Sequence, residues 1–324
     1  MIVQSSNVLV TGMSGTIGLE VARLFSNRHW VVRGVTRSSG ELADLASLAA
    51  SLPQVDLLIG DVADVSGIEA AVASSTAIVH LAGSSGVTAS FDDPLRDLSR
   101  NAAPFLRILQ AAAPQTKVVL MSSQLVYGSG GPGSPYTETQ ELDPRSPYAA
   151  HRALLETYAR IYASRNDLDV TVIRLGNVFG STYNLSRKRA HGVVPRMLGD
   201  LTEHGAVKVY GTGSQLLGLL HARDCAEAIA AVVEEPSVGG RVQVFNVAGE
   251  ELSVESVADT LVRGFGTGEV IRVPWPQDGL AMARDVHMDD VRFREAYGWM
   301  PRRSVTEALT SVARQAADAI KRAS

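Results

Sequence analysis

Short apolar segments of strand length alternate with stretches of helix length through the first half of the chain. Asn7–Thr11 has the composition of a buried strand, and Ser14–Asn27 follows it with Ile17, Val21 and Leu24 spaced along one helix face. The remaining segments of this series are Trp30–Thr36, Glu41–Ser51, Val55–Ile59, Ala77–Leu81, Pro94–Ala113, Val118–Ser122, Tyr148–Ser164 and Val170–Leu175. Because neighbouring parallel strands need crossover helices and are buried on both faces, the alternation predicts an α/β fold with a doubly wound parallel sheet.

The pattern changes after about residue 177, where loops lengthen and gain glycine and proline. Helices are predicted at Val193–Glu203, Arg223–Glu234, Val254–Gly264 and Ser304–Arg322, with short strands at Val207–Tyr210 and Val242–Asn246. We expect a first domain over residues 1–176 and a smaller, partly discontinuous C-terminal lobe over residues 177–324. Some segments, at about residues 219–248, are expected to return to the first domain.

Composition excludes several classes of protein. A formal net charge of −4 with pI near 6.0 argues against a nucleic-acid binder, and no apolar run approaches the ~20 residues that span a membrane. The start lacks the charged region of a signal peptide. One cysteine, Cys225, permits no intramolecular disulfide and no cysteine-based zinc site, so we expect a cytoplasmic protein without a metal. Only four of the 30 lysine and arginine residues are lysine.

A glycine-rich turn joins the first strand to the first helix. Gly12 permits the tight turn, Gly15 lets the backbone approach a pyrophosphate, and Gly18 allows close helix–sheet packing. The amides and dipole of a helix N-terminus attract anions, so the context predicts a dinucleotide site. Its expected contacts in this turn are Gly12, Ser14, Gly15, Thr16, Ile17 and Gly18.

The end of the second strand carries no acidic residue to hold ribose hydroxyls. Arg37 stands there instead, followed by Ser38 and Ser39, and its guanidinium can pair with a 2′-phosphate. We therefore favour NADP(H) over NAD(H); the alternatives are that Arg37 stacks on adenine or is only solvated. Further cofactor contacts are expected at the ends of the third and fourth strands, from Asp61, Val62, Leu81, Ala82 and Gly83.

A candidate catalytic group consists of Ser123, Tyr148 and Arg152, which lie at or after the ends of later strands. Tyr148 and Arg152 are four residues apart near a helix start and share one helix face. A fixed cation beside a tyrosine favours the phenolate, which makes the tyrosine a usable general acid and base. Ser123, at the end of the fifth strand, can orient a carbonyl or alcohol oxygen at the same place.

These motifs resemble the extended short-chain dehydrogenases/reductases, in particular the NAD(P)-dependent epimerase/dehydratase family that acts mostly on nucleotide sugars. The matching segments are Thr11–Gly18, Asp61, His80–Gly83, Ser122–Gly128, Arg174–Gly180, Val209–Ala226, Phe245–Val247 and Tyr297–Pro301. The resemblance implies a Rossmann domain, a substrate lobe and a small-molecule substrate. It also implies a homodimer formed by the two long helices.

The chain departs from the family at the catalytic cation. The family pattern is Tyr-x-x-x-Lys, whereas position 152 is arginine. The resemblance implies that this cation holds the nicotinamide ribose hydroxyls and lowers the pKa of the tyrosine, so Tyr148 and Arg152 are also expected cofactor contacts. Arginine keeps the positive charge, but it cannot lend a proton near neutral pH. His151 is another candidate proton donor three residues after Tyr148, although a histidine on a helix surface is usually solvated.

Two further departures concern the substrate. Dehydratases of this family carry an acidic pair after the catalytic serine or threonine, but Gln124 and Leu125 stand here, which argues against 4,6-dehydration. The arginine that grips a nucleotide diphosphate is replaced by Leu217 and the following aspartate by Gly218. Compensation is expected from Arg196, Arg284 or the basic run 187–189, although such a run is most often solvated. The expected substrate contacts are Ser84, Ser123, Gln124, Asn177, Arg196 and Arg284.

The leading hypothesis is therefore hydride transfer at a carbinol or keto carbon of a sugar or nucleotide sugar, with Ser123, Tyr148 and Arg152 as catalytic residues. The sequence leaves an epimerase and a ketoreductase both open. A reductase of a non-nucleotide carbonyl compound is one alternative. A sensor or scaffold that binds NAD(P) but has weakened catalysis is another, although a pure binder would need none of Ser123, Tyr148 and Asn177.

Overall fold

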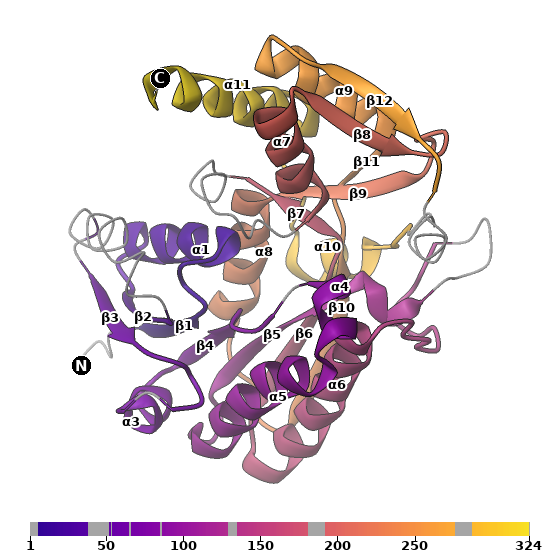
Figure 1. Cartoon of the computed structure of the whole chain (residues 1–324). Coiled ribbons are helices and arrows are strands. Elements are labelled where there is room, and N and C mark those ends of the chain that lie inside the picture. Colours follow the sequence, from indigo (N-terminus) through magenta and orange to yellow (C-terminus); the bar gives the residue numbers. More distant parts are fainter. Residues whose placement is uncertain are drawn as a thin grey trace.

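A seven-stranded parallel sheet forms the centre of the larger part of the protein (Figure 1). The computed structural model describes residues 6–37, 52, 54–64, 66–84, 86–128, 135–180, 192–275 and 287–323. The strands, in spatial order, are β10 (Arg241–Val247), β6 (Asp169–Leu175), β5 (Lys117–Ser123), β4 (Ala77–His80), β1 (Asn7–Thr11), β2 (Val31–Thr36) and β3 (Val55–Ile59). The order reverses between β1 and β4, and at such a switch point open α/β sheets bind ligands beyond the carboxyl ends of their strands.

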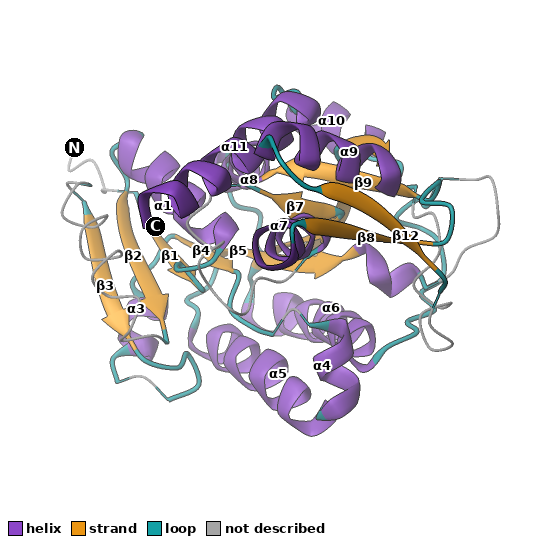
Figure 2. Cartoon of the chain, turned by 45° about the horizontal axis from the view of Figure 1, so that its top comes forward, coloured by secondary structure: helices purple, strands orange, loops and turns teal. Residues whose placement is uncertain are grey.

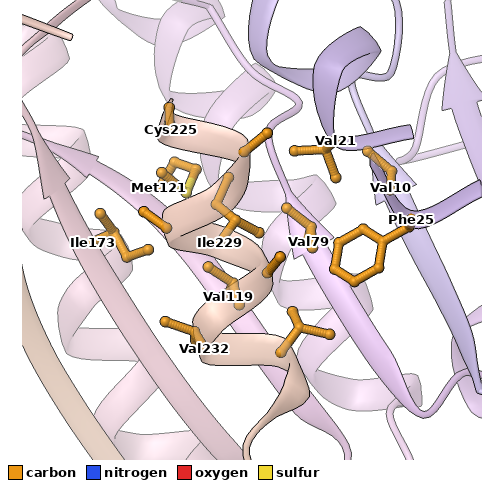
Figure 3. Packing of buried hydrophobic residues seen from close by; sticks show 14 of the residues in the cluster. Val10, Val21, Phe25, Val79, Val119, Met121, Ile173, Cys225, Ile229 and Val232 are labelled. Atoms are coloured by element: carbon orange, nitrogen blue, oxygen red, sulfur yellow. The ribbon is translucent and has the colours of Figure 1, made fainter. Parts of the chain in front are cut away.

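Helices cover both faces of this sheet. The helices α1 (Thr16–Asn27) and α8 (Ala222–Glu234) pack together on one face, where Val10, Val79 and Val119 meet Phe25 and Ile229 (Figure 3). On the other face α5 (Pro94–Ala111) and α6 (Pro147–Asn166) lie side by side, next to α3 (Ile68–Ala73) and α4 (Val87–Asp92) (Figure 2). The alternating strand residues thus fill two apolar cores, one on each side of the sheet.

A second group of elements lies beyond the carboxyl ends of the sheet (Figure 1). It contains a three-stranded sheet of β11 (Glu250–Ser253), β9 (Leu216–His221) and β7 (Asn177–Phe179), and a pair formed by β12 (Glu269–Val273) and β8 (Ala206–Tyr210). Its helices are α7 (Val193–His204), α9 (Val254–Phe265) and α11 (Val305–Ala323), which share an apolar core. The helix α10 (Val291–Tyr297) instead packs against β10.

The predicted α/β class with a parallel sheet is confirmed. The helix expected at 41–51 lies outside the described residues. The chain also forms several short elements that the sequence analysis did not predict: α3, α4, α10, β7, β9, β11 and β12. Within the described residues, none of the helices is both long and apolar enough to cross a lipid bilayer.

Candidate active site

The glycine turn is tied directly to the end of β4. Gly12 has φ +68°, and a Cβ there would lie 2.8 Å from Ala82 N, so only glycine fits. Thr11 Oγ1 accepts hydrogen bonds from the amides of Leu81 and Ala82, each with a donor–acceptor distance of 3.2 Å. These contacts bring two of the predicted cofactor-binding segments together at the switch point of the sheet.

His80 completes this connection from inside the sheet. Its Nδ1 lies 2.9 Å from Thr11 Oγ1. Because that oxygen already accepts two amide protons, its own proton goes to Nδ1, which places the ring proton of His80 on Nε2. Complete burial, and then the positive charge of Arg152, lower the pKa of His80 from 6.5 to about 3. His80 is therefore a neutral structural link between β1 and β4 near neutral pH.

The helix α1 begins in a way that suits an anion. Its N-cap residue, Gly15, is extended and provides no side-chain hydrogen bond to the first turn. Gly15 itself therefore places no side-chain acceptor at this end of the helix, where the dipole favours negative charge. Ser14 Oγ accepts a hydrogen bond from Thr36 Oγ1 over 2.9 Å, which joins the turn to the end of β2.

Arg37 and Asp61 emerge from neighbouring strand ends. The register pairs Thr36 with Ile59, so Arg37 follows β2 beside the segment that follows β3. Arg37 is exposed, whereas Asp61 is half-buried and accepts a hydrogen bond from Ala63 N over 3.0 Å. Val62 is buried. The residues expected to contact the adenosine half of a cofactor thus share one edge of the sheet.

The candidate catalytic residues come from β5 and from the start of α6. Ser123 is the last residue of β5, and its Oγ accepts a hydrogen bond from Leu125 N over 3.2 Å. Tyr148 lies in the first turn of α6, which Pro147 begins and Ser146 caps, and its amide donates to Ser90 Oγ over 3.1 Å. Tyr148 is buried except for 9% of its surface.

Arg152 is buried against Tyr148. Its Cζ lies 5.1 Å from the centre of the Tyr148 ring, within the range of a cation–π contact. Nη1 donates to the Met121 carbonyl and Nη2 to the Ser84 carbonyl, each over 3.1 Å. Arg152 Nε is buried and has no hydrogen-bond partner among the described residues. The arginine thus reaches the ends of β4 and β5 and leaves one buried donor for a ligand.

Ser84, whose carbonyl accepts a hydrogen bond from Arg152, belongs to a cluster of polar side chains. The Asp97 carboxylate accepts from Ser84 Oγ and lies 2.6 Å from His151 Nδ1. Asn101 Nδ2 donates to Ser84 Oγ and to the Asp97 carbonyl, each over 2.7 Å. The expectation that His151 is solvated is wrong, because α5 packs against α6 at this turn and places Asp97 beside it. Neither Asp97 nor Asn101 was predicted from the sequence.

Next to the candidate catalytic residues, the buried ion pair of Glu156 and Arg174 joins α6 to the ends of β5 and β6. Arg174 donates to both carboxylate oxygens of Glu156, over 3.1 and 2.7 Å, and Ser122 Oγ donates to the same group over 2.6 Å. Arg174 also donates to Tyr127 Oη over 2.8 Å. Glu156 was missed in the sequence, although it continues the four-residue spacing of Tyr148 and Arg152.

The remaining predicted substrate residues fall into three groups. Gln124 directly follows Ser123 after β5, and Asn177 begins β7, two residues after the end of β6. Asn177 Nδ2 donates weakly to the Gly218 carbonyl, at a distance of 3.5 Å. Arg196 is exposed on α7. Arg284 and the basic run 187–189 lie outside the described residues. Within the described residues, no group of three or more histidine, cysteine or acidic side chains could hold a metal ion.

The chain is similar to known proteins over almost its whole length. A UDP-glucose 4-epimerase of Mycolicibacterium smegmatis is 32% identical over 311 residues, 93% of this chain and 95% of that protein. A dTDP-glucose 4,6-dehydratase of Streptomyces niveus is 28% identical over 315 residues, 93% of this chain and 90% of that protein. The structure of a Thermus thermophilus UDP-glucose 4-epimerase with NAD has a TM-score of 0.79 at 25% identity, covering 96% of this chain and 98% of that chain.

The family itself follows from a match along most of the sequence. The sequence model of the NAD dependent epimerase/dehydratase family matches residues 8–248. This match confirms the resemblance inferred from the motifs. The chain belongs to the NAD-dependent epimerase/dehydratase family.

Proposed function

We propose that the protein transfers hydride between a nicotinamide cofactor and a carbinol or keto carbon of a nucleotide sugar, as an epimerase or a ketoreductase. The observation that carries this proposal is the buried Arg152 guanidinium over the ring of Tyr148, at the same sheet edge as Ser123. A protein that only binds a dinucleotide does not need a tyrosine, a buried cation and a serine together at this sheet edge.

The described residues fit a dinucleotide. The turn at Gly12, the start of α1 and the unpartnered Arg152 Nε form a path along the strand ends. When bound there, the nicotinamide ring supplies hydride acceptance and return. The pyrophosphate would lie against the first turn of α1, and Arg152 would hold the nicotinamide end.

Residues of the chain transfer the proton of the substrate hydroxyl group. Tyr148 takes a proton from the substrate hydroxyl during oxidation, or gives one to the carbonyl oxygen during reduction. Ser123 hydrogen-bonds the same oxygen and orients it. Arg152 supplies a fixed positive charge but, as an arginine, does not pass the proton on.

The choice between NADP(H) and NAD(H) depends on Arg37. Its exposed guanidinium at the end of β2 supports a contact with a 2′-phosphate, and we propose NADP(H) as the preferred cofactor. The related structure from Thermus thermophilus contains NAD, which supports the coarser assignment to nicotinamide dinucleotides.

Epimerisation or reduction is a better fit than dehydration. Several relatives are named dTDP-glucose 4,6-dehydratase, so family membership does not separate the reactions. Removing water from a sugar needs an acid and a base beside the reacting carbons, whereas the residues after Ser123 are Gln124 and Leu125. Neither side chain transfers a proton.

A non-nucleotide carbonyl substrate is the second candidate. Leu217, at the position of the expected diphosphate-binding arginine, packs against the apolar core of the C-terminal lobe. It therefore cannot pair with a phosphate. This observation favours a substrate without a diphosphate, unless Arg196 or Arg284 replaces the missing contact.

We also propose a homodimer through α5 and α6. These helices leave Leu95 and Ile161 exposed, with 77% and 53% of their surfaces accessible. Exposed apolar side chains on neighbouring helices suit a helix–helix interface.

The test of the proposed function is turnover with purified protein. NADPH or NADH is mixed with UDP- and dTDP-linked keto sugars, and absorbance at the nicotinamide band is followed; UDP-hexoses are assayed separately for epimerised product. We expect turnover of at least one sugar, and a fall in kcat of at least ~100-fold in Tyr148→Phe. Cofactor binding without turnover of any sugar or carbonyl compound would favour the sensor instead.

A further inference from the structure

His151 and Asp97 form a contact between α6 and α5 that the proposed mechanism does not use. His151 Nδ1 lies 2.6 Å from Asp97 Oδ2, and the two side chains are 14% and 4% exposed. A carboxylate only accepts hydrogen bonds, so the Nδ1 atom that faces it carries a proton. A carboxylate that is buried alone is strongly destabilising, and His151 therefore supplies Asp97 with a polar partner.

The second oxygen of Asp97 is bound to the loop that follows β4. Asp97 Oδ1 accepts the hydroxyl proton of Ser84, and Asn101 Nδ2 donates to the same hydroxyl group at a distance of 2.7 Å. The backbone carbonyl of Ser84 accepts from Arg152 Nη2 at 3.1 Å. A chain of contacts thus runs from His151 through Asp97 and Ser84 to the guanidinium of Arg152.

Gly83 allows this cluster to pack closely against the end of β4. A Cβ at this position would overlap Asn101 Oδ1 and would lie 3.1 Å from Arg152 Nη2. The cluster and the guanidinium therefore lie against the same backbone. Because closely packed interiors transmit displacements, a shift of the cluster would move Arg152.

The effect of the Arg152 charge depends on where the nearby carboxylate points. In the described part of the chain Arg152 forms no ion pair, although only Ser84 separates it from Asp97. We propose that His151 is a positioning residue for the catalytic group. It holds Asp97 against Ser84, so the carboxylate supports the loop and stays off the guanidinium. The positive charge of Arg152 is then left to act on Tyr148.

This assignment rests on the proposed function, because it names a further residue for the same reaction. Without the histidine, the buried carboxylate of Asp97 loses a donor and gains free energy by turning toward another one. The next cation along the contacts is Arg152. An ion pair between Asp97 and Arg152 would make the phenolate of Tyr148 less favourable and would slow its proton transfer.

The test compares substitutions of His151 in the purified full chain. His151→Leu removes the donor to Asp97, whereas His151→Asn keeps an N–H donor near the place of Nδ1 but cannot take up and release a proton as imidazole does. His151→Gln, whose amide lies farther out, replaces the leucine variant if circular dichroism shows that leucine prevents folding. The matched control is His204→Leu, exposed at the end of α7.

The measurements are kcat, the KM for the substrate and the dissociation constant of the cofactor. We expect His151→Leu to lower kcat about tenfold, because the catalytic cation is misplaced while the binding contacts remain. The KM and the dissociation constant should change little. His151→Asn should restore most of the lost kcat, and His204→Leu should have the kcat of the wild type.

A double-mutant cycle tests the route through Ser84. Ser84→Ala should by itself lower kcat about tenfold, because it breaks the same chain of contacts. If both residues act through one route, the double variant His151→Leu/Ser84→Ala should lose about tenfold in kcat, whereas independent residues would together lose about a hundredfold.

Three results would overturn the positioning role. A leucine variant with the kcat of the wild type would mean that the contact only joins the helices. Failure of His151→Asn to restore kcat would mean that His151 exchanges a proton instead of holding Asp97. Multiplied losses in the double variant would mean that His151 acts independently of Ser84. In these three cases the wild type still turns over its substrate, so the proposed function stands. A wild type without turnover of any sugar or carbonyl compound would contradict the proposed function, and the positioning role with it.

Discussion

Arg152 Nη2 and the Ser84 carbonyl oxygen are joined by a hydrogen bond of 3.1 Å, and Asp97 in turn accepts from the Ser84 hydroxyl. The second guanidinium bond also goes to a carbonyl, that of Met121. Among the described residues, Arg152 makes no ion pair with a carboxylate. Its charge is therefore held by backbone dipoles and acts on Tyr148 without a directly paired anion.

The first prediction concerns this charge. Arg152→Lys keeps a cation beside Tyr148 and should keep kcat within about tenfold of the wild type. Arg152→Met removes the charge and the hydrogen bonds to the Met121 and Ser84 carbonyls, so kcat should fall by ~100-fold or more. Steady-state turnover measures both, with circular dichroism as the control for folding. Equal kcat values in all three proteins would remove Arg152 from the catalytic group.

The second prediction treats Ser84 as a positioning residue for Arg152. Ser84→Ala loses the hydrogen bonds to Asp97 and Asn101 and frees the carbonyl that orients the guanidinium. We expect kcat to fall about tenfold with a smaller change in the KM for the sugar, and Ser84→Thr to restore it. The matched control is Ser99→Ala on the exposed side of α5. A raised KM with unchanged kcat would instead mean that Ser84 binds substrate directly.

The third prediction concerns cofactor choice. Arg37 is exposed at the end of β2, where a 2′-phosphate would lie, so NADPH should bind more tightly than NADH. Arg37→Ala should weaken NADPH binding by roughly tenfold and leave NADH nearly unchanged. Fluorescence titration of each cofactor gives the dissociation constants, and Arg33→Ala, within β2, is the control. An unchanged preference would place Arg37 outside the cofactor site.

The longer strands and the glycine turn were predictable because their signals are local. NVLVT followed by a glycine turn specifies β1 and the start of α1 within about a dozen residues. The strand β9 was not predicted, since Gly218 interrupts its apolar run and weakens any strand signal. Pairing with β11 and β7 overrides that weakness, and such pairing joins segments far apart in the chain.

The site was predictable to a similar extent. Tyr148 and Arg152 share a helix face by spacing alone, and the sequence could place them together. The Asp97–His151 contact joins two helices 54 positions apart, so no spacing predicts it. Glu156 carried a weak signal, because a third residue at the same spacing on α6 also faces the sheet, where it meets Arg174.

The last prediction concerns stability and pH. Burial lowers the pKa of His80 in the folded protein to about 3, whereas the same group in the unfolded chain titrates near 6.5. Between these values the unfolded state binds a proton that the folded state does not. The contribution of His80 to stability is therefore fully present above pH 6.5 and is lost as the pH falls from 6.5 toward 3.

Urea unfolding at a series of pH values measures this loss. Over that window the wild type should lose up to ~1.4 kcal/mol per pH unit through this one group, on top of the loss from carboxylates. His80→Gln cannot titrate, so its curve should be shallower by about that amount, although it starts lower because the stacking on Phe105 is lost. His204→Gln, exposed at the end of α7, should keep the wild-type slope. Parallel curves for the wild type and His80→Gln would show that His80 takes up its proton as readily in the folded protein as in the unfolded chain, so that burial does not lower its pKa.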